Sequence, residues 1–167
     1  MTQLAAIRPD DWNLPLFLHV LGALALIGTL AVAIALLIGA QRNRSVDTLR
    51  SALRSLTLGV IPSWIVLRGS AEWIADKEGW NEVDEPPAWI GIGYTATDLG
   101  LLLIVASSVL AWLSLRKARA GETGDSPLPR VAAGLITLLV VLNVVALWAM
   151  TTKPASASAL PHSQRAC

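Results

Sequence analysis

Long apolar stretches alternate with short polar segments along this chain. A helix needs roughly 20 apolar residues to cross a hydrocarbon core about 30 Å thick. Four stretches reach that length, and they cover residues 14–40, 55–75, 88–115 and 131–150. The apolar runs show no period-two alternation, which half-buried strands would require. The pattern therefore predicts an all-α fold, a transmembrane four-helix bundle.

Composition agrees with a membrane protein. Hydrophobic residues make up 54% of the 167 residues and charged residues 15%, against roughly 25% charged residues in an ordinary soluble protein. This balance excludes a disordered chain and a nucleic-acid-binding protein. The single cysteine, Cys167, excludes an intramolecular disulfide. We expect residues 1–152 to form one four-span membrane domain, and residues 153–167, rich in Ala, Ser and Pro, to be a disordered tail.

Basic residues in the connecting segments predict the orientation. The segments after the first and third spans hold eight basic and three acidic residues, whereas the segment after the second span holds one basic residue and five acidic ones. Cytoplasmic segments of membrane proteins carry the excess of Lys and Arg. We therefore expect a multi-pass protein of the plasma (inner) membrane with both termini outside.

A few large polar or ionisable side chains interrupt the apolar spans, and these lie in the outer half, whereas the inner half holds only small hydroxyl residues. At 1.5 Å per residue, their positions are roughly 5 to 15 Å from the outer ends of the spans. An ionisable group costs about 2.5–3.5 kcal/mol at mid-depth, so such groups face protein or water. The predicted binding or buried polar cluster comprises His19, Arg68, Glu72, Tyr94, Asp98 and Asn143.

Within this cluster, one ion pair between helices is expected. Trp64, Arg68 and Glu72 follow one another at intervals of four residues, so they share one face of the second span. Asp98 is the other ionisable residue at the depth of Arg68, and we expect the two to pair. The cluster is interpreted as a structural link between helices, as a functional pocket open to the outside, or as exposed groups, Glu72 above all, that extend to the membrane boundary.

The sequence carries none of the common motifs of catalysis or metal binding. It has no P-loop, no HExxH motif and no set of Cys and His at metal-ligand spacing, so no catalytic residue, metal or cofactor is predicted. Haem b remains an alternative through His19, but the only other histidine is His162 in the tail. A copper site needs a cluster of His, Met or Cys, and the methionines are Met1 and Met150.

The segment Leu16-Phe17-Leu18-His19-Val20-Leu21-Gly22-Ala23, continued to Gly28, resembles the first-helix pattern of small bacterial integral membrane proteins. These include copper-resistance-D-like proteins and related families of unknown function. The resemblance covers about a dozen residues of the 167. It implies a bacterial multi-helix membrane protein with His19 at the outer face, associated with a metal or with redox chemistry.

Three hypotheses about function follow. The first is a non-enzymatic accessory or assembly subunit, because the connecting segments are too short to hold a catalytic domain. The second is a carrier of a small molecule, an ion or protons that uses Arg68, Asp98, Glu72 and His19. The third is a haem- or quinone-linked redox subunit. The expected partners are the lipid bilayer and a homo-oligomer or larger membrane complex, with no nucleic acid.

Overall fold

The computed structural model describes residues 13–79, 88–121 and 126–152, and these residues contain helices and no strand. The prediction of an all-α protein is confirmed for this part of the chain. In chain order, the elements are α1 (Asn13–Asn43), α2 (Val46–Arg54), η2 (Ser55–Val60), α3 (Ile61–Lys77), α4 (Ala88–Arg119) and α5 (Leu128–Thr151).

Three of these helices are long and apolar enough to cross a membrane. They are α1, the Trp89–Arg119 part of α4, and α5, in agreement with a membrane protein. The stretch expected as the second span, residues 55–75, corresponds to η2 and α3, which follow each other without a break. Taken alone, α3 has 17 residues and a length of about 26 Å at 1.5 Å per residue.

The segment expected as a loop before the second span is in fact largely the helix α2, so this part of the prediction was wrong. The Ser45 hydroxyl oxygen accepts a hydrogen bond from the Thr48 N–H at 3.2 Å and caps the helix. Leu49 and Ala52 are buried against the rest of the protein. The helix α2 also contains Arg50 and Arg54, and its pattern is amphipathic, with the apolar positions Leu49 and Ala52 facing inward.

A π-helical turn, η2, joins α2 to α3. The Ile61 N–H bonds to the carbonyl of Leu56, five residues back, and Pro62 follows directly. Proline has no N–H and cannot continue the regular ladder of hydrogen bonds, and wide turns of this kind occur where that ladder is disturbed. The elements α2, η2 and α3 therefore form one continuous helical segment that is irregular at its middle.

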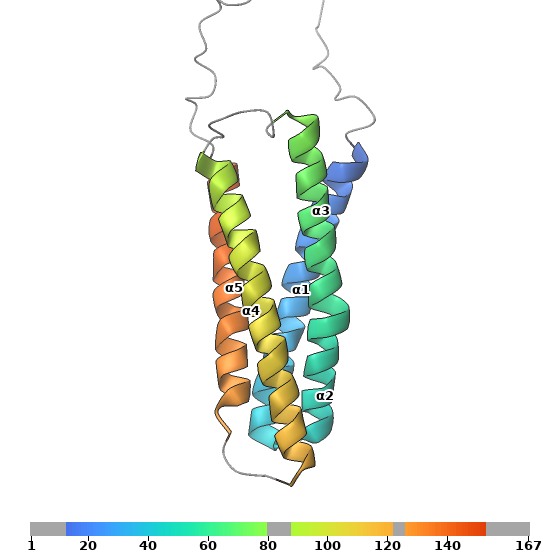
Figure 1. Ribbon diagram of the computed structural model, residues 1–167, viewed down its shortest axis with the longest axis vertical. Coiled ribbons are helices and arrows are strands. Elements are labelled where there is room, and N and C mark those ends of the chain that lie inside the picture. Colours follow the sequence, from blue (N-terminus) through green and yellow to red (C-terminus); the bar gives the residue numbers. More distant parts are fainter. Residues whose placement is uncertain (1–12, 80–87, 122–125, 153–167) are drawn as a thin grey trace, which may run out of the picture.

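The helices lie side by side along the long axis (Figure 1). At one end lie the first residue of α1, the last of α3, the first of α4 and the last of α5. We call this the acidic end, because Asp76 and Glu78 lie there, and the opposite end the basic end, because Arg42, Arg116 and Arg119 lie there.

The apolar core occupies the half of the molecule nearer the basic end. Its buried side chains come from α1, α2, η2, α4 and α5: Leu26, Leu30, Ala33, Leu37, Ala52, Leu56, Val60, Ile104, Ala111, Ala132, Ala133, Ile136 and Leu139. The helix α3 contributes none of them. The tightly packed part of the molecule therefore lies on the basic-end side of the polar residues.

Toward the acidic end, the helices form two closely packed pairs. In the α1–α3 pair, a Cβ atom added at Gly22 would lie 2.9 Å from the backbone nitrogen of Leu67. In the α4–α5 pair, a Cβ atom added at Gly93 would lie 2.7 Å from Met150 Cε. Figure 1 shows α4 leaning toward α5 and away from α3 at this end. Long polar side chains bridge the wider separation between α3 and α4.

Candidate functional site

The bridging side chains come from one face of α3. Trp64, Arg68 and Glu72 are spaced four residues apart, so they lie above one another along the helix. Each of them bonds to a group on α4 or lies close to one. The predicted stripe is therefore the surface through which α3 meets α4.

The guanidinium group of Arg68 is the centre of this arrangement. Its Nη1 atom lies 2.5 Å from Glu72 Oε1, one turn along the same helix, and its Nη2 atom lies 3.7 Å from Asp98 Oδ1 on α4. The same group lies over the ring of Tyr94, 4.4 Å from the ring centroid, a distance typical of a cation–π contact. The two residues expected to pair, Arg68 and Asp98, are thus within ion-pair distance, but the contact with Glu72 is shorter.

Tyr94 also bonds to Glu72. Its hydroxyl group donates a hydrogen bond to Glu72 Oε2 at 3.1 Å. Arg68 and Tyr94 therefore bond to different oxygens of one carboxylate, while the arginine rests on the tyrosine ring. Glu72 is thus bonded to side chains of both α3 and α4. Asp98 lies farther from the guanidinium group than Glu72 does, so Arg68 neutralises the Asp98 carboxylate less.

Sequence reasoning missed the contact that closes the site toward the basic end. The indole N–H of Trp64 donates a hydrogen bond to the backbone carbonyl of Thr97 at 3.1 Å. The Trp64 Nε1 atom also lies 3.9 Å from the position that a Cβ atom on Gly100 would occupy. The four-residue spacing of the stripe was the sequence signal for this contact, because it places Trp64 on the face that carries Arg68.

His19 lies apart from this network. Its Nδ1 atom is 3.5 Å from the Ser70 hydroxyl oxygen, across the contact between α1 and α3. Ser70 follows Arg68 by two residues, which is a rotation of about 200° around the helix. The structure therefore places His19 and Arg68 on opposite sides of α3. Ser70 is a second residue that the sequence did not single out.

Asn143 also lies outside the network. Its side-chain nitrogen donates a hydrogen bond to the carbonyl of Leu139 on its own helix, at 2.9 Å. Four of the six expected residues are thus brought together: Arg68, Glu72, Tyr94 and Asp98. We call these four the α3–α4 network.

The network is only partly enclosed. The Arg68 side chain is 24% exposed, that of Glu72 is 45% exposed and that of Asp98 is 67% exposed. The expectation of a buried cluster therefore fits Arg68 but not Asp98, because α4 turns this carboxylate outward. One guanidinium faces two carboxylates, so the network has a formal charge of −1 when all three groups are ionised.

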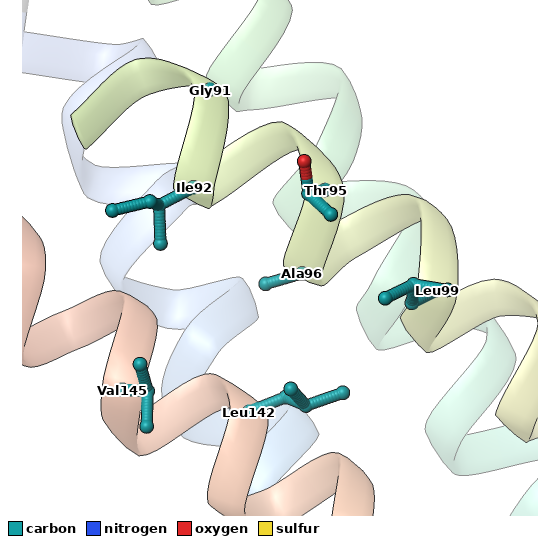
Figure 2. Close-up of a pocket in the computed structure, with 7 residues that line it drawn as sticks. All are labelled: Gly91, Ile92, Thr95, Ala96, Leu99, Leu142 and Val145. Carbon is teal, nitrogen blue, oxygen red and sulfur yellow. The ribbon is translucent and has the colours of Figure 1, made fainter. Parts of the chain in front are cut away.

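A shallow apolar hollow of about 370 Å³ lies on the outer surface of α4 and α5. Figure 2 shows its lining: Gly91, Ile92, Thr95, Ala96 and Leu99 from α4, and Leu142 and Val145 from α5. The small side chains of α4 leave this hollow open. Asp98 follows Thr95 by three residues and precedes Leu99, so it lies beside the hollow on the side toward α3.

Within the described ranges, no three His, Cys, Asp or Glu side chains are grouped as metal ligands. The arrangement has the chemistry of an ion-paired, hydrogen-bonded link between helices with one carboxylate left at its edge. Comparison of the chain with protein-family models, with curated proteins and with solved structures gives no match.

Proposed function

We propose that this chain is a four-span membrane protein that acts as a non-enzymatic accessory or assembly subunit of a larger membrane complex. In this proposal η2 and α3 together form one span, the second in chain order, and α1, α4 and α5 form the other three. The helix ends at the acidic end lie outside the plasma membrane, and those at the basic end lie in the cytoplasm. The concentration of Arg and Lys at the basic end supports this orientation.

The exposure of the Asp98 side chain on the surface of α4 is the observation that carries the proposal. Asp98 is the eleventh residue of α4, a helix apolar enough to cross a membrane, and its side chain is 67% exposed. Facing lipid, a carboxylate at this depth costs about 2.5–3.5 kcal/mol. A second membrane protein that covers this face of α4 removes that cost.

The short connections between the helices also support a subunit without its own catalytic domain. Two residues separate α1 from α2, and α2 continues through η2 into α3. The long helices α1, α4 and α5 expose many large apolar side chains, which are available for contact with lipid or with other spans.

Purification from the membranes of the source cell in a mild detergent tests the proposal. We expect the tagged full-length chain to co-purify with a different membrane protein in constant stoichiometry. Thr95→Phe places a bulky ring on the outward face of α4 and should reduce this recovery severalfold. Val144→Phe adds a ring to the exposed face of α5 and serves as the matched control, with recovery unchanged.

A carrier of protons or ions is the second candidate, and the excess carboxylate of the α3–α4 network favours it. If the chain purifies only with itself, and alone catalyses a proton or ion flux in liposomes that Asp98→Asn abolishes, the accessory role is wrong. The haem- or quinone-linked alternative stays a prediction.

A further inference from the structure

The outward face of α4 carries a continuous stripe with a spacing of four and three residues in alternation. Its members are all exposed: Gly91, Thr95, Asp98, Leu102, Val105, Val109 and Trp112. This is the spacing at which packed helices meet along a left-handed seam. Gly91 and Thr95 are small and border the hollow beside α5, so the backbone of another helix can approach closely there.

Asp98 distinguishes this stripe from an ordinary lipid-facing surface. It is the one charged member of an otherwise apolar or small set of residues. The nearest cation, the guanidinium group of Arg68, is shared with Glu72. Arg68 lies 2.5 Å from Glu72 but 3.7 Å from Asp98. The unbalanced negative charge of the network therefore lies at the surface of α4, where a partner can reach it.

A second copy of this chain is a poor occupant of the stripe on charge grounds. Among the described residues 55–75, 88–115 and 131–150, Arg68 is the single Arg or Lys. It is already engaged with Glu72 and Tyr94. A second copy would thus bring another unbalanced carboxylate to the seam rather than a cation.

A lipid acyl chain fits the apolar hollow but does not neutralise Asp98. This residue lies about 15 Å from the start of α4, which is halfway across a hydrocarbon core of about 30 Å. Lipid headgroups lie outside that depth. A Lys or Arg on the membrane-spanning helix of another protein can reach this depth and neutralise Asp98.

We infer that the outward stripe of α4 binds a transmembrane helix of a different protein, and that this helix carries a Lys or Arg at the depth of Asp98. The inference rests on the proposed accessory function and specifies the partner's chemistry. The small residues Gly91 and Thr95 receive the partner's backbone, and Asp98 pairs with its cation. A single charged position in an apolar seam also fixes the register of the two helices.

The test uses defined probes in place of an unidentified partner. The purified full-length chain is labelled with a fluorescence acceptor on its single cysteine, Cys167, and reconstituted in phosphatidylcholine vesicles. The probes are two donor-labelled Leu/Ala transmembrane peptides that differ only in having Lys or Leu at the central position. We expect energy transfer to report binding of the Lys probe about tenfold tighter than that of the Leu probe, which corresponds to about 1.4 kcal/mol, because the Lys probe alone can pair with Asp98.

Variants of the chain assign the effect to Asp98. Asp98→Asn should remove the preference for the Lys probe, while Asp98→Glu should retain it. Asp47→Asn, which removes an exposed carboxylate at the basic end, is the matched control and should leave the preference unchanged. Circular dichroism of each variant verifies that its helices are intact, and the comparison of the two probes on the unchanged chain keeps the inference falsifiable if Asp98→Asn does not fold.

The inference would be overturned by equal binding of the two probes, or by a preference that Asp47→Asn removes as well as Asp98→Asn. Asp98-dependent association of the chain with itself would also overturn it, in favour of a second copy. If the probes bind equally but a membrane protein still co-purifies in a Thr95-dependent way, the accessory function stands and only this partner chemistry is wrong. The two proposals can therefore fail separately.

Discussion

Arg68 contacts three side chains at once, so the effect of a substitution depends on which charges it leaves paired. Its guanidinium bonds to Glu72, lies within ion-pair distance of Asp98 and covers the ring of Tyr94. Loss of the arginine leaves two carboxylates without a counter-charge. Loss of Asp98 leaves one arginine with one glutamate, which is a balanced pair.

The two substitutions should therefore differ in their effect on stability. We expect Arg68→Met to lower the free energy of unfolding in mixed micelles by roughly 2 kcal/mol, because charges left unpaired in a low-dielectric site are costly. Asp98→Asn should change it by less than about 1 kcal/mol, in the range of single polar contacts between membrane helices. Adding Asp98→Asn to Arg68→Met should recover part of the loss. Equal losses for the two single variants would show that Asp98, and not Glu72, is the main partner of Arg68.

The residues of the α3–α4 network could be predicted from depth, and their separation from His19 and Asn143 could not. Position along a span follows directly from residue number, so Arg68 and Asp98 were expected at matching depths. The rotation of each helix about its axis depends on packing. Packing turns Ser70 toward His19 and Arg68 toward α4, and it leaves Asn143 bonded within its own helix.

At the scale of the elements, the contact between α1 and α3 depends on a missing side chain. A Cβ atom at Gly22 would lie 2.9 Å from the Leu67 backbone nitrogen and 3.1 Å from its Cα atom. Backbone atoms cannot rotate away as a flexible side chain can. The close approach of these two helices is therefore specific to glycine at this position.

Gly22→Ala should force α1 and α3 apart and lower the free energy of unfolding by about 1–3 kcal/mol, the usual cost of overpacking. Gly28→Ala on the same helix is the matched control, because a Cβ atom there would have no neighbour within 4 Å. That variant should be neutral or slightly more stable, since alanine favours helix. Both values come from the same denaturant titration, and a neutral Gly22→Ala would contradict the close approach.

The π-helical turn η2 could not be predicted from the hydrophobic periodicity of the sequence. An apolar run predicts a helix of about the right length, but it does not distinguish a wide turn from a regular one. Pro62 was the local sign of a disturbance. The structure adds that Gly59 of η2 meets Thr29 of α1 so closely that a Cβ atom would lie 2.9 Å from Thr29 Cγ2.

At the scale of the whole molecule, the first residue of α1, the last of α3, the first of α4 and the last of α5 lie at one end (Figure 1). This arrangement was expected from an even number of spans. The three apolar helices were the easiest to predict, because their mean hydropathy is high, at 2.0 to 2.7. The second span was harder to predict, since Arg68 and Glu72 lower its hydropathy and the π-helical turn η2 interrupts its regular geometry.

The proposed orientation can be read from the single cysteine. A membrane-impermeant maleimide should label Cys167 in intact cells, because the C-terminus is expected outside. In a Cys167→Ser background, Thr123→Cys places the only thiol between α4 and α5 and should react only after the membrane is permeabilised. The opposite pattern of labelling would reverse the orientation, and labelling of both positions in intact cells would remove α5 as a span.

The short bond between Arg68 and Glu72 has a consequence for biosynthesis. Both residues belong to α3 and lie one turn apart, so this helix neutralises its own arginine as soon as it forms. In the proposed four-span topology, α3 can then leave the translocation channel and enter lipid before α4 has been made. Asp98 arrives later, with α4, and meets an arginine that is already occupied. The order of synthesis along the chain thus leaves Asp98, and not Glu72, as the carboxylate in need of a partner.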